Sequence, residues 1–131
     1  MSASTGWGRE QEVEVTAELI AEYAAAVGEQ PRAYDRGAAA PPMFAVVYSA
    51  PAIWETIVAS VEGPGPLIHA AQEFEWYAPV HAGDRIATRA RLDRRDTEGA
   101  HPSLRFRSIS SRGGDLVSQG VWTILAPKGS L

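Results

Sequence analysis

The sequence predicts an α+β domain in which an antiparallel sheet of about five strands wraps around one central apolar helix. Two observations carry this prediction. Residues 43–61 form a long apolar segment whose only charge is Glu55, and a segment that is apolar nearly all round is typical of a buried helix. The second half of the chain holds four strand-like segments separated by turn signals.

Two shorter elements precede the apolar segment. Residues 11–15 alternate polar and apolar side chains, which indicates a short strand. A helix is predicted over residues 17–27, with Thr16 as its N-cap and Gly28 at its C-terminal end. Inside the apolar segment, Pro51 is expected to start a second helical piece or to kink a single helix.

The four later strands are predicted at residues 66–80, 84–98, 102–112 and 116–127. In the second of them Ile86, Thr88 and Ala90 oppose arginines, so one face is dry and the other wet. One sheet around one apolar helix is the hot-dog architecture. Such a domain leaves strand edges unpaired, so a dimer is expected.

Length and composition limit the function classes. The chain has 131 residues, a net charge of −4 and no cysteine, so we expect one domain over residues 1–131, with residues 1–10 flexible, and neither nucleic acid nor an acidic membrane surface as partner. No signal peptide and no apolar run of about 18 residues is evident, which favours a cytoplasmic protein without a membrane span. The three histidines lack ligand spacing, so no metal site is expected.

Three stretches occur in order at residues 40–44 (APPMF), 67–75 (LIHAAQEFE) and 77–84 (YAPVHAGD). The first resembles the Ala-Pro-Pro-Thr-Phe entry to the central helix in the MaoC-like hot-dog family, the R-specific enoyl-CoA hydratases and (3R)-hydroxyacyl thioester dehydratases. The second resembles the Leu-x-His-Gly-Glu-Gln strand of the family's non-catalytic, N-terminal-type half, and the third resembles the turn that follows it. The resemblance extends from about residue 10 to residue 127.

The loop after the first helix departs from the family pattern. The catalytic half of the family carries Gly-Asp-x-Asn-Pro-x-His there, whereas this chain reads GEQPRAY over residues 28–34 and has Ala33 where the histidine belongs. Glu29 takes the place of the aspartate only if a one-residue gap is allowed. Hydration of an enoyl thioester needs an acid and a base, each contributing roughly 10²–10⁴ in rate. Glu29 is therefore the single catalytic candidate, and a solvated turn residue is the interpretation that the local sequence favours.

The resemblance also implies an acyl pocket along the central helix. Its candidate substrate-binding residues are Met43, Phe44, Val47, Trp54 and His69. By their residue type the first four are core residues, and His69 is a hydrogen-bonded core histidine unless the fold places it beside substrate. Arginines 85, 89, 91, 94 and 95 form a stripe that is either a solvated sheet face or a contact for the phosphates of coenzyme A.

These observations favour an acyl-thioester-binding subunit that supplies its pocket to a catalytic hot-dog partner in an enoyl-CoA hydratase or (3R)-hydroxyacyl dehydratase. The alternatives are a homodimeric acyl-CoA-binding module without catalysis and a hot-dog thioesterase, since fold alone does not choose among them. No cofactor is expected, and coenzyme A or an acyl carrier would enter as part of the thioester substrate. The partner is either a second copy or a catalytic chain.

Overall fold

The structure is a computed structural model that describes residues 6–35, 37–62 and 65–131. Its elements along the chain are β1 Gln11–Glu14, α1 Ala17–Ala26, η1 Pro31–Tyr34, η2 Pro42–Phe44, α2 Ala45–Ser60, β2 Ile68–Trp76, β3 Arg85–Asp96, β4 Ser103–Arg112 and β5 Asp115–Leu125. All of the predicted elements are present, and their ends lie within a few residues of the predicted ones.

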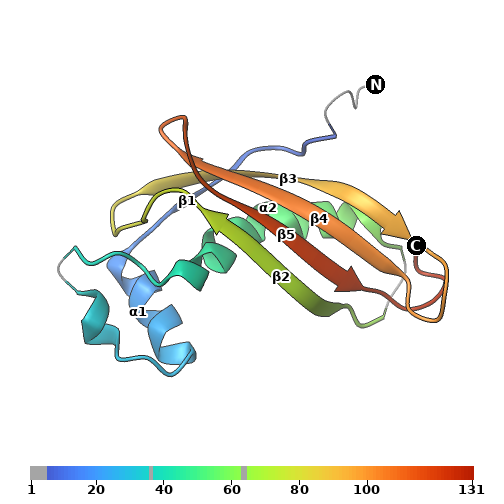
Figure 1. Cartoon of the computed structure of the whole chain (residues 1–131), viewed down its shortest axis with the longest axis horizontal. Coiled ribbons are helices and arrows are strands. Elements are labelled where there is room, and N and C mark those ends of the chain that lie inside the picture. Colours follow the sequence, from blue (N-terminus) through green and yellow to red (C-terminus); the bar gives the residue numbers. More distant parts are fainter. Residues whose placement is uncertain (1–5, 36, 63–64) are drawn as a thin grey trace.

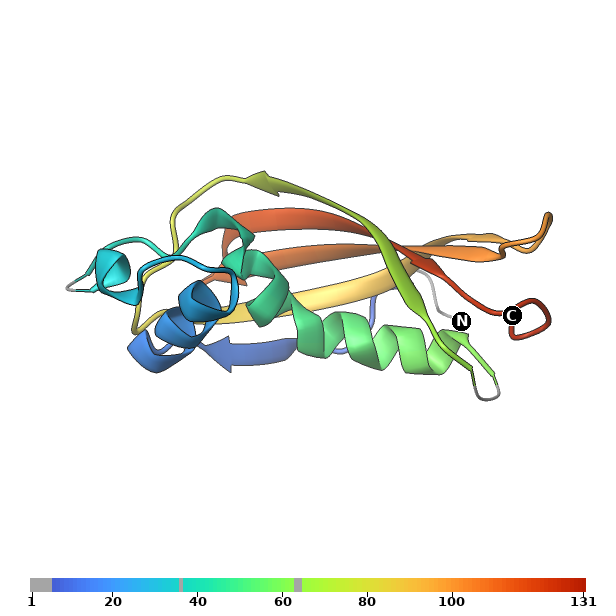
Figure 2. The ribbon, with the colours of Figure 1, turned by 90° about the horizontal axis from the view of Figure 1, so that it is seen from below.

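The five strands form one antiparallel sheet in the order β1-β3-β4-β5-β2. Helix α2 runs along one face of this sheet, while α1 and the two short 3₁₀ helices lie together beyond one end of it (Figures 1 and 2). The predicted hot-dog fold is therefore confirmed. The predicted N-cap of α1 is also present, since the Thr16 hydroxyl accepts the Leu19 backbone N–H at 3.1 Å.

Helix α2 is a single helix with one buried face. Its buried side chains include Tyr48, Ala52 and Ile53, which pack against apolar side chains on the inner face of the sheet. The expectation of burial all round is wrong, because Trp54 is 61% and Val58 56% exposed on the opposite face. Pro51 does not divide the helix: it lies on the exposed side, within the continuous span Ala45–Ser60.

By length and composition alone, the 19-residue span Pro42–Ser60 would reach across a membrane. The sequence-based expectation that no segment is long enough was therefore wrong on length. The central helix of a hot-dog domain has the same character, and here Ala52, Ile53 and Ile57 are buried against the sheet. We therefore interpret this span as the core helix of the domain.

Small and hydroxyl-bearing side chains form much of the sheet surface beneath α2. The Tyr48 hydroxyl lies 2.7 Å from the Ser118 hydroxyl, Thr88 and Ser110 are equally close to each other, and the Trp122 indole N–H donates to Ser108 at 3.0 Å. These side chains are buried, and each hydrogen bond satisfies polar groups that would otherwise be desolvated without a partner. The Tyr48–Ser118 bond joins the helix to the sheet and the other two join neighbouring strands, so polar contacts add to the apolar packing.

Part of the segment expected to be flexible, residues 1–5, lies outside the described residues. In the described part, the Gly8 N–H donates to the Ala90 carbonyl at 2.7 Å and the Arg9 guanidinium bonds to Glu55 at 2.8 Å. These contacts tie residues 8 and 9 to β3 and α2.

Gly120 is a point of close approach in β5. A Cβ atom at this position would lie 2.7 Å from Phe74 Cε1 and from Ser108 Oγ, and 2.9 Å from Trp122 Nε1. We predict that Gly120→Ala lowers the free energy of unfolding by about 1–3 kcal/mol, because the buried neighbours have to move. Urea unfolding measures the effect, with Thr123→Ala on the same strand as the control. An unchanged unfolding midpoint for Gly120→Ala would contradict the prediction.

Candidate functional site

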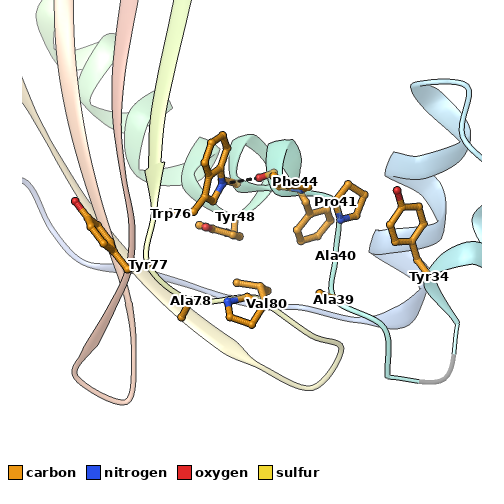
Figure 3. Close-up of a pocket in the computed structure, with 13 residues that line it drawn as sticks. Tyr34, Ala39, Ala40, Pro41, Phe44, Tyr48, Trp76, Tyr77, Ala78 and Val80 are labelled. Atoms are coloured by element: carbon orange, nitrogen blue, oxygen red, sulfur yellow. Dashed lines mark hydrogen bonds between the residues drawn. The ribbon is translucent and has the colours of Figure 1, made fainter.

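A cavity of about 490 Å³, called the large cavity below, lies where η2 and the start of α2 face the chain between β2 and β3 (Figure 3). Its lining is mostly apolar and aromatic. The lining residues are Tyr34, Ala39, Ala40, Pro41, Pro42, Phe44, Ala45, Tyr48, Trp76, Tyr77, Ala78, Pro79 and Val80. None of these is a carboxylate, an imidazole or a cation, so the polar side-chain groups at the cavity are phenols and one indole.

Two hydrogen bonds hold the walls of this cavity together. The Trp76 indole N–H donates to the Pro42 carbonyl at 2.8 Å, drawn as the dashed line in Figure 3. The Ala40 N–H donates to the Val80 carbonyl at 2.7 Å. Because each bond joins residues 40–44 to residues 76–80, the two segments that resemble the family motifs form opposite walls of one pocket.

The turn at residues 81–84 anchors the second wall. One oxygen of the Asp84 carboxylate accepts the His81 backbone N–H at 2.9 Å and the Arg112 guanidinium at 2.7 Å, and Arg112 also donates to the Pro79 carbonyl at 2.9 Å. Burial acts to raise the pKa of Asp84, but the His81 amide and Arg112 together outweigh it and hold the pKa below its ordinary value. The carboxylate is therefore ionised at neutral pH and fixes the chain leading into β3.

Tyr48 and Phe44 lie one turn apart and line the inner end of the cavity. Burial raises the pKa of Tyr48, and its hydrogen bond with Ser118 offsets part of that effect. The phenol is neutral at physiological pH and already hydrogen-bonded. Tyr48 therefore contributes shape and a fixed dipole to the cavity rather than a group that exchanges protons near neutrality.

The loop after α1 brings Glu29 and Tyr34 together. Gly28 adopts φ +83°, which turns the chain into η1, and the Tyr34 hydroxyl donates to the Glu29 carboxylate. This hydrogen bond is the main cause of a raised pKa for Tyr34. Tyr34 lines the cavity, whereas Glu29 is exposed and lies outside its lining. Ala33, at the position of the family's histidine, is exposed in η1.

A second cavity of about 240 Å³ lies near the other end of α2. It is lined by Ala50, Ile53, Trp54, Ile57, Leu67, His69, Trp122 and Ile124. The His69 ring stacks on Trp122 with 5.3 Å between centroids, and its Nε2 lies 2.9 Å from Gln72 Oε1. The imidazole is thus held flat against an apolar wall, in an exposed position on β2.

The structure divides the sequence-predicted residues between these places. Phe44 lines the large cavity, and Trp54 and His69 line the smaller one. Met43 and Val47 line neither; Met43 is exposed and Val47 packs against the core. Sequence reasoning missed Tyr48 and Trp76. The i, i+4 spacing of Tyr48 from Phe44 is a usable signal for the first, but nothing local indicated the second.

The arginine stripe is largely engaged in ion pairs. Arg85 pairs with Glu12 at 2.8 Å, Arg89 with Glu10 at 3.8 Å and Arg91 with Asp93 at 3.4 Å. These pairs are typical of a solvated sheet face. In the part of the chain that the structure describes, no group of three or more His, Asp or Glu residues is arranged to hold a metal ion.

Comparison with known proteins gives matches at the level of family and of fold. The family model described as "FAS1-like, dehydratase domain region" matches residues 3–114. A UPF0336 protein of Cutibacterium acnes is 42% identical over 77 residues, which is 55% of this chain and 53% of that protein. The match therefore spans about half the length of this curated relative.

Several solved structures share the fold. One is the HadBC (3R-hydroxyacyl-ACP dehydratase) complex of Mycobacterium tuberculosis, with TM-score 0.69, 21% identity and coverage of 88% of this chain and 90% of that chain. Another is the ChsH1-ChsH2 complex of the same organism, with TM-score 0.70, 16% identity and coverage of 95% and 90%. The R-hydratase PhaJ1 of Pseudomonas aeruginosa has TM-score 0.62, 20% identity and coverage of 94% and 81%.

The anchoring role of Asp84 has a testable pH dependence. We predict that Asp84→Asn lowers the free energy of unfolding at neutral pH by about 1–2 kcal/mol, because a charge-assisted hydrogen bond to Arg112 is lost. The folded pKa is depressed, so the stabilisation is present above the ordinary aspartate pKa of 3.8 and is lost as the pH falls through the lower folded value. Urea unfolding from neutral to acidic pH measures the difference, which should shrink in acid. The exposed Asp35→Asn variant is the control, and a difference independent of pH would contradict the assignment.

Proposed function

Because this chain belongs to the FAS1-like dehydratase domain family and has the MaoC-like hot-dog fold, we propose that it is the acyl-thioester-binding subunit of an enoyl-CoA hydratase or (3R)-hydroxyacyl dehydratase. In this role it lends an acyl pocket to a catalytic hot-dog partner. One observation carries the proposal: the segments that resemble the family motifs form walls of one cavity, and among the described residues its lining includes no carboxylate, imidazole or cation.

The pocket has the character of an acyl site. Its volume of about 490 Å³ falls in the range of small-molecule sites, which are concave and mostly apolar with a few placed polar groups. The smaller cavity beside Trp54 and His69 lies further along the same helix, at the opposite core cluster. An acyl chain that extends along α2 would therefore meet apolar and aromatic surface near both ends.

The missing chemistry explains why a partner is needed. Reversible addition of water to an enoyl thioester requires a group that both accepts and donates a proton near neutral pH. Phenols such as Tyr48 and Tyr34 have pKa values raised further above 10, so they do not fill that role. Glu29 is exposed and bonded to Tyr34, and imidazole is absent from the loop. The acid–base pair is expected to come from the partner.

The comparisons are consistent with such an assembly. The HadBC dehydratase and ChsH1-ChsH2 are named as complexes of two different chains, and this chain covers about nine-tenths of a chain in each. The lack of a carboxylate in the cavity also favours the binding-module alternative over a thioesterase, because hydrolysis needs a nucleophile or base beside the thioester. Binding module and enzyme subunit are distinguished by adding the partner.

We predict that the purified chain alone hydrates crotonyl-CoA very slowly. Co-expression with a hot-dog chain that carries the Asp and His pair should raise the rate by roughly 10² or more, because the missing acid and base are then supplied. Hydration is followed spectrophotometrically, and Glu29→Gln should change the rate of the complex little. Efficient hydration by the chain alone, abolished by Glu29→Gln, would overturn the proposal.

Acyl preference in the complex should depend on the smaller cavity. Trp54→Ala enlarges it. Because one methylene of fit in an apolar pocket is worth roughly 1–3 kcal/mol, the ratio of kcat/KM for a longer to a shorter acyl chain should change by about tenfold or more. Trp54 is exposed, so the variant is expected to fold. Met43→Ala, which lies outside both cavities, is the matched control. A chain-length profile that ignores Trp54→Ala would show that the acyl group binds elsewhere.

A further inference from the structure

The two edges of the sheet differ in how their charges are neutralised. Strand β1 forms one edge and has only four residues, Gln11–Glu14. Its exposed carboxylates face arginine: Arg85 bonds to Glu12 at 2.8 Å and lies 3.7 Å from Glu14. A short edge with paired charges is a typical way to prevent further strand pairing.

Strand β2 forms the opposite edge and is unprotected. It has nine residues and pairs with β5 alone among the described strands (Figure 1). Phe74, opposite Gly120, faces the core, so its neighbours Glu73 and Glu75, opposite Val121 and Gln119, face the outer side of the sheet. Both carboxylates are exposed.

These two carboxylates lack a cation of their own. In the described part of the chain neither takes part in an ion pair; Glu75 accepts the Tyr77 hydroxyl at 3.3 Å. Arg107 shares a shallow hollow with both, but its guanidinium pairs with Asp93 at 3.5 Å. The free edge therefore carries uncompensated negative charge on a protein whose net charge is already −4.

We propose that the β2 edge pairs with a different hot-dog chain whose adjoining edge strand carries lysine or arginine at the outward-facing positions, and that this charge pattern selects against a second copy of the chain. The proposal rests on the proposed function only for the kind of partner. The occupant follows from charge complementarity, since opposite charges across neighbouring strands stabilise pairing and like charges oppose it.

Self-pairing centred in the C-terminal half of β2 would bring the same carboxylates together. In an antiparallel pair related by a two-fold axis, a centre at Glu73, Phe74 or Glu75 places a carboxylate of one copy directly opposite one of the other. Each such contact raises the dissociation constant of the self-paired dimer by up to about fivefold. A contact that lies off the two-fold axis occurs twice, so we expect an overall increase of roughly tenfold. A basic partner strand reverses the sign of the same interaction.

Apolar surface beside this edge supports its use as an interface. Trp54 lines the smaller cavity together with residues from the start of β2, and Val58 lies one helical turn further on; both are more than half exposed. Ile68, at the start of β2, is 57% exposed. A partner on the β2 edge would cover apolar side chains of this kind, which gives affinity, while the carboxylates give selectivity.

The test uses copies of this chain as defined partners. Analytical ultracentrifugation at low salt compares the wild type, the neutral variant Glu73→Gln/Glu75→Gln, and an equimolar mixture of wild type with Glu73→Lys/Glu75→Lys. Nitrogen-15 labelling of the wild type lets native mass spectrometry identify mixed dimers. The control mixture contains Glu22→Lys/Glu98→Lys, which changes net charge equally at exposed positions on α1 and in the β3–β4 turn. Circular dichroism checks that every variant is folded.

We expect the neutral variant to self-associate roughly tenfold more tightly than the wild type, and the wild type and charge-reversed mixture to form mixed dimers in preference to either homodimer. At about 1 M salt, where the Debye length is about 3 Å, these differences should largely vanish. The proposal would be overturned by equal dissociation constants for all samples or by the absence of mixed dimers in the charge-reversed mixture. It would also be overturned if the control mixture with Glu22→Lys/Glu98→Lys formed mixed dimers as tightly as the charge-reversed mixture. Calorimetric binding of octanoyl-CoA by the same variants reports on the acyl pocket separately.

Discussion

The packing of α2 against β3 and β4, with Tyr48 reaching Ser118 of β5, is the contact on which the rest of the structure depends. Ser110 and Ser118 present small side chains to Ser49 and Tyr48 of the helix. Within the sheet, Gly120 and Ser108 leave room for Phe74 and Trp122 in the same core. Hydrogen bonds of Tyr48 with Ser118 and of Ser49 with Ser110 join the helix to β5 and β4 and select one position of the helix on the sheet. Apolar packing alone would be less specific, because it has no preferred direction.

The position of α2 in turn determines the cavity. The helix starts directly after η2, so fixing Tyr48 on Ser118 also fixes the residues that bond to Trp76 and Val80. The Asp84 turn holds the other wall from the outside. The pocket is therefore a consequence of framework contacts that are independent of catalysis. This independence allows the cavity to form although the loop after α1 has Ala33 where the resembled motif has histidine.

Much of this framework was accessible from sequence because it follows local patterns. Three signals predicted the hot-dog fold: the alternation of polar and apolar residues along the strands, the Thr16 cap and the three motif-like stretches. Each of them depends only on residues close together in the sequence. Side chains that meet across the fold were harder to identify. Trp76 joins the cavity through a bond to Pro42, 34 positions away in the sequence, and Met43 and Val47 have the apolar character of pocket residues but point elsewhere.

The exposed face of α2 shows why hydropathy overestimated burial. A hydropathy pattern reports which surface avoids water in the working assembly, whereas the single chain shows which surface its own sheet covers. For α2 these two surfaces differ at the exposed apolar strip formed by Trp54 and Val58, which the chain's own sheet does not cover. Under the proposed heterodimer the difference is covered by the partner along the β2 edge, so the same strip forms both the interface and one wall of the smaller cavity. Binding of an acyl chain and binding of the partner would then stabilise the same side chains, and by linkage each would strengthen the other.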